Sequence, residues 1–378
     1  MSAAPLIVLT AGGTGGHVFP AEALARALAA RGYRLALVTD RRGTSYQGAL
    51  AQIETHRLPV TTLAGSIVQR LRGGLDLALS TMRARSLLRR LAPAAVVGFG
   101  GYPSLPAMFA AGQLGIPTAI HEQNAVLGRA NRLLVRRVSA VATSFPQVRH
   151  LPEAVAGRVS LTGNPVRPAV IGLRRDGYQA LGPDGRLRVL VTGGSQGARI
   201  FSDVVPAAVM SLPFEQRARL AIVQQCRPED IENARGTYET ADVSAELATF
   251  FEDLPTRLAQ ASLVICRAGA STVAELTVIG RPALLVPYPY ATDDHQRANA
   301  AALTAGGAGW MIPNAEFTPE ALAARLASLL ADPAPLGAAA AAAEALGRPD
   351  AAERLADLVM RLAPANGHSA GEPAGRAA

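Results

Sequence analysis

The sequence predicts an α/β protein made of two doubly wound, Rossmann-like halves that face each other across a cleft. First, apolar strand-like runs alternate with helical stretches along 378 residues, a length that favours two domains. Second, such a run leads into a glycine-rich segment twice, at residues 6–16 and again at residues 187–197. Third, prolines and a polar stretch interrupt the alternation at residues 163–185, where we expect the domain boundary.

The N-terminal half begins with the apolar run 6–10, which predicts a buried parallel strand, and continues into the glycine-rich segment 11–17. A helix is expected over residues 21–28, with Pro20 in its first turn. Glycines let the backbone approach a ligand closely, and free N–H groups at a helix start favour phosphate. We therefore expect a nucleotide or sugar phosphate here, with a plain tight turn as the alternative. Val18 replaces the third glycine of the dinucleotide fingerprint, so that fingerprint fails.

The other strands follow the same alternation. In the first half they are expected at residues 35–39, 94–99, 118–121 and 140–143. In the second half they are expected at residues 187–192, 219–224, 248–251, 263–266 and 283–286. The resulting domains span residues 1–166 and 167–345, followed by a helical segment at 346–363 and a disordered tail at 364–378. Packing of the helical segment back against the N-terminal domain is one arrangement open to it.

Composition excludes several kinds of chemistry. The chain contains no lysine, so its basic residues are all arginines. A Walker phosphate loop, a pyridoxal or Schiff-base mechanism and a protein kinase of the familiar type all need a lysine, and they are excluded. Cys226 and Cys266 each lie beside an apolar run, which is typical of reduced core thiols in a cytosolic protein. No disulfide framework is expected.

The formal charge of +8 is compatible with an acidic small substrate, an anionic membrane surface or nucleic acid as a partner. Aromatic residues make up only 4% of the chain, which argues against single-stranded nucleic acid, because its binding usually needs stacking platforms. The first apolar run is too short for a secretory signal, and no run of about twenty apolar residues predicts a membrane span. We expect no nucleic-acid partner.

Short glycine-rich and polar motifs follow one another along roughly residues 6–360. They are Gly13-Thr14-Gly15-Gly16-His17, Gly100-Gly101-Tyr102-Pro103-Ser104, His121-Glu122-Gln123-Asn124, Gly163-Asn164-Pro165-Val166-Arg167, Gly193-Gly194-Ser195-Gln196-Gly197-Ala198, Arg267-Ala268-Gly269-Ala270-Ser271-Thr272-Val273-Ala274-Glu275 and Asp294-His295-Gln296. Together they closely resemble the MurG family of bacterial glycosyltransferases. The resemblance implies a GT-B fold. It also implies transfer of N-acetylglucosamine from UDP-N-acetylglucosamine to undecaprenyl-linked muramyl-pentapeptide, converting lipid I into lipid II in cell-wall peptidoglycan synthesis.

The resemblance assigns donor binding mainly to the second half. Glu275 is expected to accept hydrogen bonds from ribose hydroxyls, and Arg167 to reach the diphosphate. Gln296 is expected to contact the sugar hydroxyls, together with Asn124 from the first half. The other expected substrate-binding residues are Thr14, Gly15, Gly16, Ser195, Phe251, Ala270, Ser271 and Thr272. Structural alternatives are helix capping for the hydroxyl residues and a solvated surface position for the charged ones.

One segment departs from the family pattern. The resemblance places the uracil-contacting segment at residues 251–254, where Glu252 replaces an aliphatic residue. If backbone groups recognise the base, the replacement is tolerated. Otherwise it alters base specificity.

The implied reaction inverts the anomeric carbon and needs a general base on the acceptor side. His17 is the first candidate because imidazole titrates near neutrality, and Glu122 is the second. A fixed hydrogen-bond donor to phosphate or acceptor is the alternative role for His17. The chain has no Asp-x-Asp triplet, and its cysteines and histidines are not at ligand spacing, so we expect neither metal nor cofactor. Helix termini and arginines are then expected to stabilise the leaving group.

Residues 67–72 and 87–91 interleave apolar side chains with arginines, with further leucines between them. The pattern alone favours an ordinary core-facing helix with a charged outer face. The lipid-linked acceptor implied by the resemblance favours peripheral attachment to the anionic cytoplasmic face of the bacterial inner membrane. The expected partners are UDP-N-acetylglucosamine, lipid I and this membrane surface, with other cell-wall synthesis and division proteins as further candidates.

Three other functions stay open at this point. Asp40 ends the second strand about twenty residues after the first glycine segment, where an NAD-dependent oxidoreductase carries its ribose-binding acid. The failed fingerprint and the second glycine segment argue against that function. A non-catalytic protein would bind UDP-N-acetylglucosamine without turnover. Another GT-B transferase, or a UDP-N-acetylglucosamine 2-epimerase that needs no lipid acceptor, is the nearest alternative.

Overall fold

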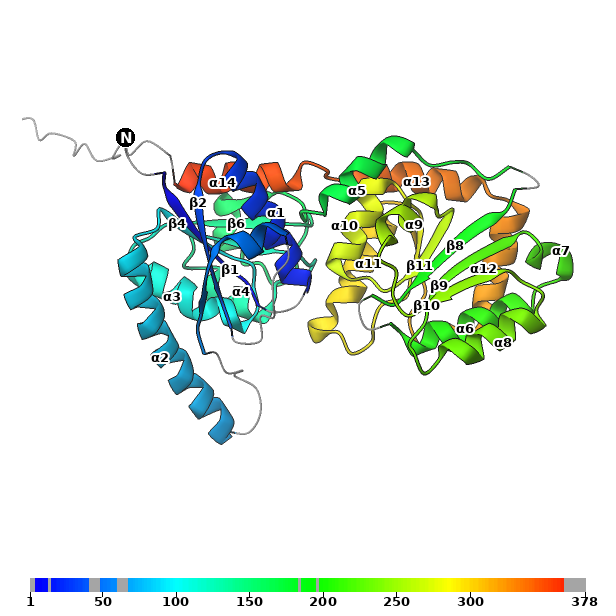
Figure 1. The fold of residues 1–378 in the computed structure, drawn as a ribbon, viewed down its shortest axis with the longest axis horizontal. Coiled ribbons are helices and arrows are strands. Elements are labelled where there is room, and N and C mark those ends of the chain that lie inside the picture. The colour runs from blue at the N-terminus through cyan, green and yellow to red at the C-terminus, as the bar shows by residue number, and fades with distance from the viewer. Residues whose placement is uncertain are drawn as a thin grey trace, which may run out of the picture.

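The protein is described by a computed structural model, which covers residues 4–12, 15–40, 48–59, 67–182, 185–194 and 197–363. These residues form two parallel α/β domains that lie side by side (Figure 1), which confirms the predicted GT-B fold. The expected tail over residues 364–378 lies outside the described residues.

The N-terminal domain is built on a seven-stranded sheet with the order β3-β2-β1-β4-β5-β6-β7. Its strands are β1 (Leu6–Thr10), β2 (Arg34–Thr39), β3 (Glu54–Arg57), β4 (Ala95–Gly98), β5 (Thr118–Glu122), β6 (Ala140–Thr143) and β7 (Val159–Leu161). Its helices are α1 (Gly15–Ala30), α2 (Ile67–Leu91), α3 (Leu105–Gln113) and α4 (Arg129–Leu134). Short 3-10 turns occupy Gly48–Gln52, Tyr102–Ser104 and Glu153–Arg158.

The C-terminal domain is built on a six-stranded sheet with the order β10-β9-β8-β11-β12-β13. Its strands are β8 (Leu187–Thr192), β9 (Leu220–Gln225), β10 (Ala245–Ala248), β11 (Leu263–Cys266), β12 (Ala283–Leu285) and β13 (Gly309–Met311). Its helices are α5 (Pro168–Gly172), α6 (Arg199–Met210), α7 (Phe214–Arg217), α8 (Ile231–Thr240), α9 (Leu254–Gln260), α10 (Ala270–Ile279), α11 (His295–Ala305), α12 (Pro319–Ala331) and α13 (Ala334–Leu346). Two 3-10 turns lie at Leu173–Asp176 and Thr292–Asp294.

Apolar side chains on both faces of each strand explain why both sheets are buried. In β1, Ile7 and Leu9 face α1 and the last helix, α14 (Ala351–Leu362), whereas Val8 faces α3 on the other side. All recorded strand pairs are parallel. The carboxyl ends of the strands in a domain therefore meet at one edge of its sheet.

The chain passes between the domains twice, near residues 162–167 and again near residues 347–350. After the second crossing, α14 packs against α1 of the N-terminal domain (Figure 1). Arg31 forms ion pairs with Glu353 and with Asp357 of α14, and Tyr33 donates a hydrogen bond to the carbonyl of Ala363. The end of the described chain therefore completes the first domain.

Two expectations about local structure were wrong. Helix α1 begins at Gly15, so Pro20 is its sixth residue and lies outside the first turn. The backbone already turns helically within the glycine-rich segment, because glycine accepts that geometry without help from a proline. Strand β10 runs over Ala245–Ala248 rather than 248–251, and Phe251 lies beyond it.

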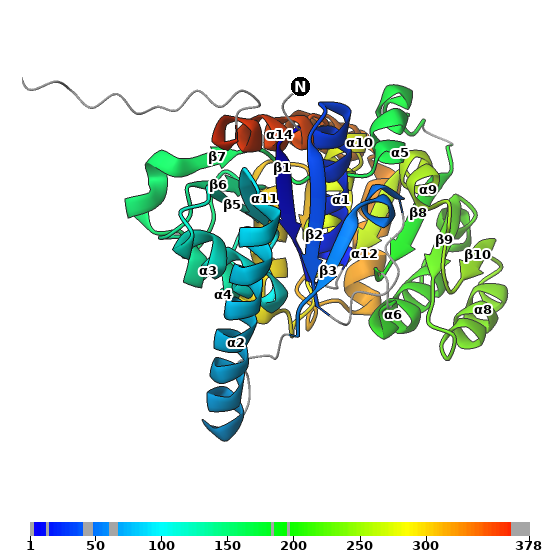
Figure 2. The same ribbon diagram turned by 60° about the vertical axis from the view of Figure 1, so that its left-hand side comes forward.

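Helix α2 projects from the N-terminal domain beyond the other elements (Figure 2). Within the described residues, no single helix is long and apolar enough to cross a membrane. One pair, Pro319–Ala331 and Ala334–Leu362, reaches that length and composition only jointly, across a bend of 97°.

Candidate functional site

A cavity of about 800 Å³ lies between the two domains, and we call it the main cleft. It forms at the carboxyl ends of β1 and β8. The strand order reverses at each of these strands, since β2 and β4 flank β1, and β9 and β11 flank β8. Ligands of open α/β sheets bind at such points, outside the carboxyl ends of the strands. The N-terminal domain contributes Gly16, His17, Gln123 and Asn124 to the lining. The C-terminal domain contributes residues that include Gly193, Gly194, Gly197, Ala198, Arg267, Gly269, Ala270, Ser271, Thr272, His295 and Gln296.

The start of helix α10 faces the main cleft with free hydrogen-bond donors. Its N-cap residue, Gly269, has no side chain to satisfy the first-turn N–H groups. Ala270, Ser271 and Thr272 line the cleft, and the buried Ser271 hydroxyl has no hydrogen-bond partner in the described part of the chain. These groups are arranged to bind an anion, because unpaired N–H groups and the helix dipole both favour negative charge there.

Arginines add positive charge to the same wall. Arg267 lines the main cleft, and its guanidinium donates to the carbonyls of Val286 and Pro287 and to Asn314 Oδ1. Burial lowers the pKa of Arg267. The cleft also contains Arg199 and Arg227, which form ion pairs with Asp203 and with Glu229 and Asp230, respectively. Arg267 has no carboxylate partner among the recorded ion pairs of the described residues, so it is the guanidinium that a diphosphate would meet first.

Gln296 presents its amide to the main cleft in a fixed orientation. Its side-chain oxygen accepts hydrogen bonds from the backbone N–H of Ala268, at 3.2 Å, and of Tyr288, at 2.9 Å. The oxygen must be the atom at that position because both partners are donors. The Gln296 NH2 group is therefore available to donate to a ligand.

A smaller cavity of about 300 Å³ lies beside the main cleft on the N-terminal domain, and we call it the side cavity. Both cavities share His17, Gln123, Asn124 and His295. The side cavity is also lined by Gly100, Gly101, Tyr102, Glu122, Arg129 and Asp293. His17 therefore borders two spaces that two different substrates could occupy.

The His17 ring packs against the glycine pair after β4. A Cβ atom built on Gly100 would lie 3.3 Å from His17 Cε1, and one on Gly101 would lie 3.6 Å from His17 Cδ2. Both glycines also have positive φ, at 89° and 74°. Side chains at these positions would be strained and would crowd the imidazole, which explains why glycine is found at both.

A chain of hydrogen bonds sets the tautomer of His17. The Gln123 NH2 group donates to the carbonyl of Phe99, so the Gln123 oxygen faces His17 Nδ1, at 3.2 Å. Nδ1 must then carry the proton, which leaves Nε2 as an acceptor. The second Gln123 hydrogen meets His121 Nδ1 at 3.0 Å, and His121 Nε2 donates to the carbonyl of Gly163 at 3.0 Å.

Burial lowers the pKa of His17 below its ordinary value of 6.5, and the nearby Glu122 carboxylate opposes part of that effect. Burial also lowers the pKa of His121 to about 4. Both imidazoles are therefore neutral at pH 7. A neutral His17 with an unprotonated Nε2 is the form needed to accept a proton.

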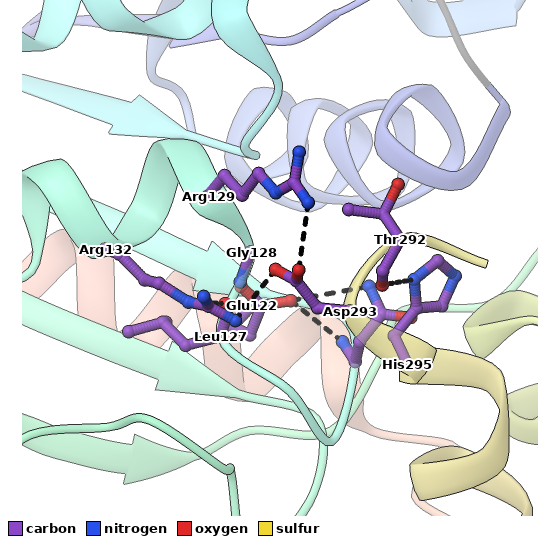
Figure 3. A network of polar contacts seen from close by, with 9 residues as sticks. Glu122, Leu127, Gly128, Arg129, Arg132, Thr292, Asp293 and His295 are labelled. Carbon is purple, nitrogen blue, oxygen red and sulfur yellow. Dashed lines mark hydrogen bonds and ion pairs between the residues drawn. The ribbon is translucent and has the colours of Figure 1, made fainter. Parts of the chain in front are cut away.

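Glu122, the second predicted base, is buried and organises the loop between β5 and α4. Its carboxylate accepts a hydrogen bond from the backbone N–H of Gly128, at 2.8 Å (Figure 3). It also accepts from the backbone N–H of Asn124, at 3.0 Å, and from Asn131 Nδ2, at 2.8 Å. These contacts fix the loop that lines the side cavity. They leave the Glu122 carboxylate less free than His17 Nε2 to take a proton from a substrate.

Polar contacts also join the two domains across the cleft. Asn299 of α11 donates to Asn124 Oδ1, at 3.1 Å, and accepts from the backbone N–H of Ala125, at 2.8 Å. Arg129 and Arg132 of α4 form ion pairs with Asp293, at 3.0 and 2.9 Å (Figure 3). Asp293 has a positive φ of 54°, a conformation that few residues other than glycine adopt.

Arg167 and Glu275, two of the predicted substrate-binding residues, contact each other. The Arg167 guanidinium donates two hydrogen bonds to the Glu275 carboxylate, at 2.9 and 3.0 Å. The Glu275 side chain is only 10% exposed, so removing this partner would leave a largely buried carboxylate without its ion pair. Neither residue is part of the main-cleft lining given above.

The structure places the remaining predicted residues unevenly. Gly15 begins α1, whereas Thr14 and Ser195 lie outside the described residues. Phe251 is buried beneath the guanidinium of Arg257, 4.3 Å from its ring centre, and is not in the cleft lining. The Phe251 ring therefore does not line the main cleft, where the sequence predicted that it contacts uracil.

Several residues at the site were not predicted. Tyr288 and Tyr290 line the main cleft, and their rings form an edge-to-face pair. Asn299 and Asp293 join the domains, and Arg267 lies within a predicted motif without having been assigned a role. Tyr288 and Tyr290 belong to a Pro-Tyr-Pro-Tyr run after β12, which was the one available signal in the sequence.

Within the described residues, no group of three or more His, Cys, Asp and Glu side chains is arranged to hold a metal ion. The donors available to a negatively charged ligand are instead backbone N–H groups, amides and guanidinium groups.

Family models match both domains. Residues 7–143 match the glycosyltransferase family 28 N-terminal domain, and residues 188–355 match the glycosyltransferase family 28 C-terminal domain. The chain is 59% identical over 379 aligned positions to a protein of Rhodospirillum centenum, with all of both chains covered. That relative is named UDP-N-acetylglucosamine–N-acetylmuramyl-(pentapeptide) pyrophosphoryl-undecaprenol N-acetylglucosamine transferase. A relative of the same name from Paramagnetospirillum magneticum is 56% identical, with 95% of this chain and 97% of the relative covered.

Solved structures show the same arrangement of domains. MurG of Acinetobacter baumannii superposes with a TM-score of 0.78 at 32% identity, covering 94% of this chain and all of that one. A UDP-N-acetylglucosamine 2-epimerase from Neisseria meningitidis superposes with a TM-score of 0.65 at 13% identity, covering 94% of this chain and all of that one. At that identity the epimerase likeness shows the fold alone.

Proposed function

Because this chain belongs to glycosyltransferase family 28, we propose that its two adjoining cavities hold a nucleotide-sugar donor and a lipid-linked acceptor. The chain is a UDP-N-acetylglucosamine-dependent N-acetylglucosaminyltransferase that converts lipid I into lipid II in peptidoglycan synthesis. The observation that carries the arrangement is the position of His17, which borders both cavities. The full-length identity to transferases also argues against the epimerase and oxidoreductase alternatives.

The main cleft is proposed to hold the donor. The first turn of α10, the Ser271 hydroxyl and Arg267 would bind the diphosphate, and the Gln296 NH2 group would donate to a sugar hydroxyl. These groups gain interaction energy as UDP departs, because negative charge then accumulates on the β-phosphate. Thr14, Gly15, Gly16, Ser195, Ala270 and Thr272 remain proposed substrate contacts.

Glu275 is proposed to accept hydrogen bonds from the ribose. Arg167 occupies only part of its carboxylate, since each oxygen has a further lone pair. In this arrangement Arg167 holds the Glu275 carboxylate in position, which differs from the diphosphate contact expected from the sequence. Asn124 is proposed to contact the sugar from the opposite wall.

His17 is proposed as the general base. The acceptor 4-hydroxyl attacks the anomeric carbon, its proton passes to His17 Nε2, and the bond from the anomeric carbon to the β-phosphate oxygen breaks to release UDP. Gln123 supports this role by holding the proton on Nδ1. Glu122 is then a positioning residue, which shapes the acceptor loop and opposes the effect of burial on His17.

We further propose that α2 attaches the enzyme to an anionic membrane surface at the cytoplasmic face. Leu75, Leu79 and Met82 are 64%, 46% and 69% exposed and follow one another at helical spacing. Arg83, Arg89 and Arg90 are exposed on the same helix. Apolar side chains beside arginines suit the boundary between acyl chains and anionic headgroups.

One assay tests these roles. Radiolabelled UDP-N-acetylglucosamine is incubated with a lipid I analogue, with and without chelator, for the wild type, His17→Ala and Glu275→Ala. We expect product with the chelator present, loss of turnover with retained UDP affinity for His17→Ala, and weakened UDP affinity for Glu275→Ala. Undiminished turnover in His17→Ala would remove His17 as the base and leave Glu122 as the candidate. Release of free UDP without acceptor would indicate the epimerase reaction instead.

A further inference from the structure

A third cavity, of about 130 Å³, lies behind the active site at the junction of the two domains, and we call it the hinge cavity. Its walls come from both chain crossings, as Gly163 and Asn164 belong to the first and Arg348 to the second. Residues of α10 and α11 form the wall on the side of the C-terminal domain. A single water needs roughly 10–15 Å³ of such space, so the volume suits a molecule of about ten non-hydrogen atoms.

Asn164, which lines this cavity, carries a buried and unpaired amide. The residue is 5% exposed, and neither its side-chain oxygen nor its nitrogen has a hydrogen-bond partner within the described ranges. Leaving such an amide buried and unpaired is unfavourable, because its hydrogen bonds to water are lost and not replaced. A ligand with a hydrogen-bonding head group would remove that cost.

Arg348 supplies a positive charge at the same place. A Cβ atom built on Gly163 would lie 2.9 Å from both Cβ and Cδ of Arg348, so the missing side chain at Gly163 makes room for the arginine stem. Gly163 also has a φ of 87°. Among the residues with described side chains, no ion pair or hydrogen bond engages the Arg348 guanidinium.

Most of the remaining lining is apolar, and Ser144 and Thr277 are its polar members. Phe145, Pro146, Val273, Val278, Leu303 and Leu346 surround the space. An unpaired amide, a guanidinium and an apolar wall are together complementary to a small molecule with an apolar chain and a carboxylate.

We propose that the hinge cavity binds a small apolar carboxylate and that this ligand changes the affinity of the main cleft for UDP. Val273 and Ala274 of the lining belong to α10, the helix whose first turn faces the main cleft. Gly163 accepts the hydrogen bond from His121 that begins the chain leading to His17. The proposed effect on UDP affinity rests on the proposed donor site. The proposed binding of a carboxylate in the hinge cavity does not depend on it.

Calorimetric titration of the full chain with octanoate tests the site, with octan-1-ol and octylammonium as matched probes. We expect saturable octanoate binding at least tenfold tighter than that of either probe. Arg348→Gln should weaken octanoate to the level of the alcohol. Ala302→Leu should abolish binding by filling the cavity, whereas Ala301→Leu, a neighbour outside the lining, should bind like the wild type.

Octanoate that binds no tighter than octan-1-ol, or that binds Ala302→Leu as well as the wild type, would overturn the site. Thermal unfolding and UDP titration of each variant establish that it is folded. Titrating UDP with and without saturating octanoate then tests the link, and we expect a change in UDP affinity of at least threefold. Equal UDP affinities, in a protein that binds both molecules, would overturn the link without affecting the donor site.

Discussion

The protonation of His17 depends on the single amide of Gln123. Replacing Gln123 with Glu places a carboxylate beside Nδ1, which should raise the pKa of His17 from its present value below 6.5. Activity depends on neutral His17, so the acidic limb of the kcat/KM profile should move to higher pH by about one unit or more. The profile is measured between pH 5 and 9. UDP affinity measured at pH 8 serves as the control, and an unmoved acidic limb would contradict the role given to Gln123.

His121 links the stability of the fold to pH. Its pKa is about 4 in the folded protein, against an ordinary value of 6.5 for an exposed imidazole, so the unfolded chain takes up the proton first as the pH falls. Its contribution is complete above pH 6.5 and disappears toward pH 4, with a total of roughly 3 kcal/mol. Urea unfolding at pH 7.0 and 4.5 measures the difference. His121→Gln should reduce this pH dependence, and an equal dependence in both proteins would show that His121 does not cause it.

At the scale of the elements, helix α2 provides a test of membrane attachment. Replacing Leu75, Leu79 and Met82 with Ser removes apolar side chains that are largely exposed, so folding and UDP binding should be kept. Cosedimentation with anionic vesicles at low salt should fall at least tenfold, since each buried apolar side chain contributes about 1.5–3 kcal/mol.

The matched control is Phe214→Ser in α7, where the ring is 59% exposed on the other domain. This variant should bind vesicles like the wild type. If the wild type itself ignores anionic vesicles, or if the triple variant binds them equally well, α2 is not the attachment site.

The long elements could be predicted from the sequence because their apolar patterns are strong. Strands β1, β8 and β11 consist mainly of buried aliphatic residues, with the exposed Arg188 in β8 as the exception, and each leads into a glycine-containing segment before the next helix. The edge strand β3 could not be predicted, because its sequence Glu-Thr-His-Arg has polar side chains and no buried position. Its pairing with β2 comes from the neighbouring strand rather than from its own residues.

The residues of the candidate site could be predicted where a single chain segment determines their geometry. Contacts between segments that are far apart in the sequence were missed. His17 and the start of α10 follow directly from strand, loop and helix signals. The contact of Asn124 with Asn299, 175 positions apart, depends on how the domains meet, and that of Arg167 with Glu275, 108 positions apart, depends on how the first chain crossing lies against α10. No local pattern in the chain specifies either contact.

At the scale of the whole molecule, Asp293 helps to set the spacing of the two domains. Asp293→Asn should weaken both ion pairs with α4 and lower kcat/KM about threefold to tenfold, while UDP affinity changes little. Arg129→Gln combined with Asp293→Asn should cost no more than Asp293→Asn alone, because the residues act as one unit. Steady-state kinetics at low and high salt measure this effect. Additive losses would show that the two residues act independently.

The return of α14 to the first domain has a consequence for biosynthesis. Leu355, Ala356 and Val359 cover the same sheet face as Ile7 and Leu9, so the first strand shares a core with a helix that is translated after the whole C-terminal domain. The N-terminal domain therefore keeps an uncovered apolar surface until α14 has been translated. The C-terminal domain lies wholly between β7 and α14 in the sequence. It can therefore fold before α14 is available to complete the N-terminal domain.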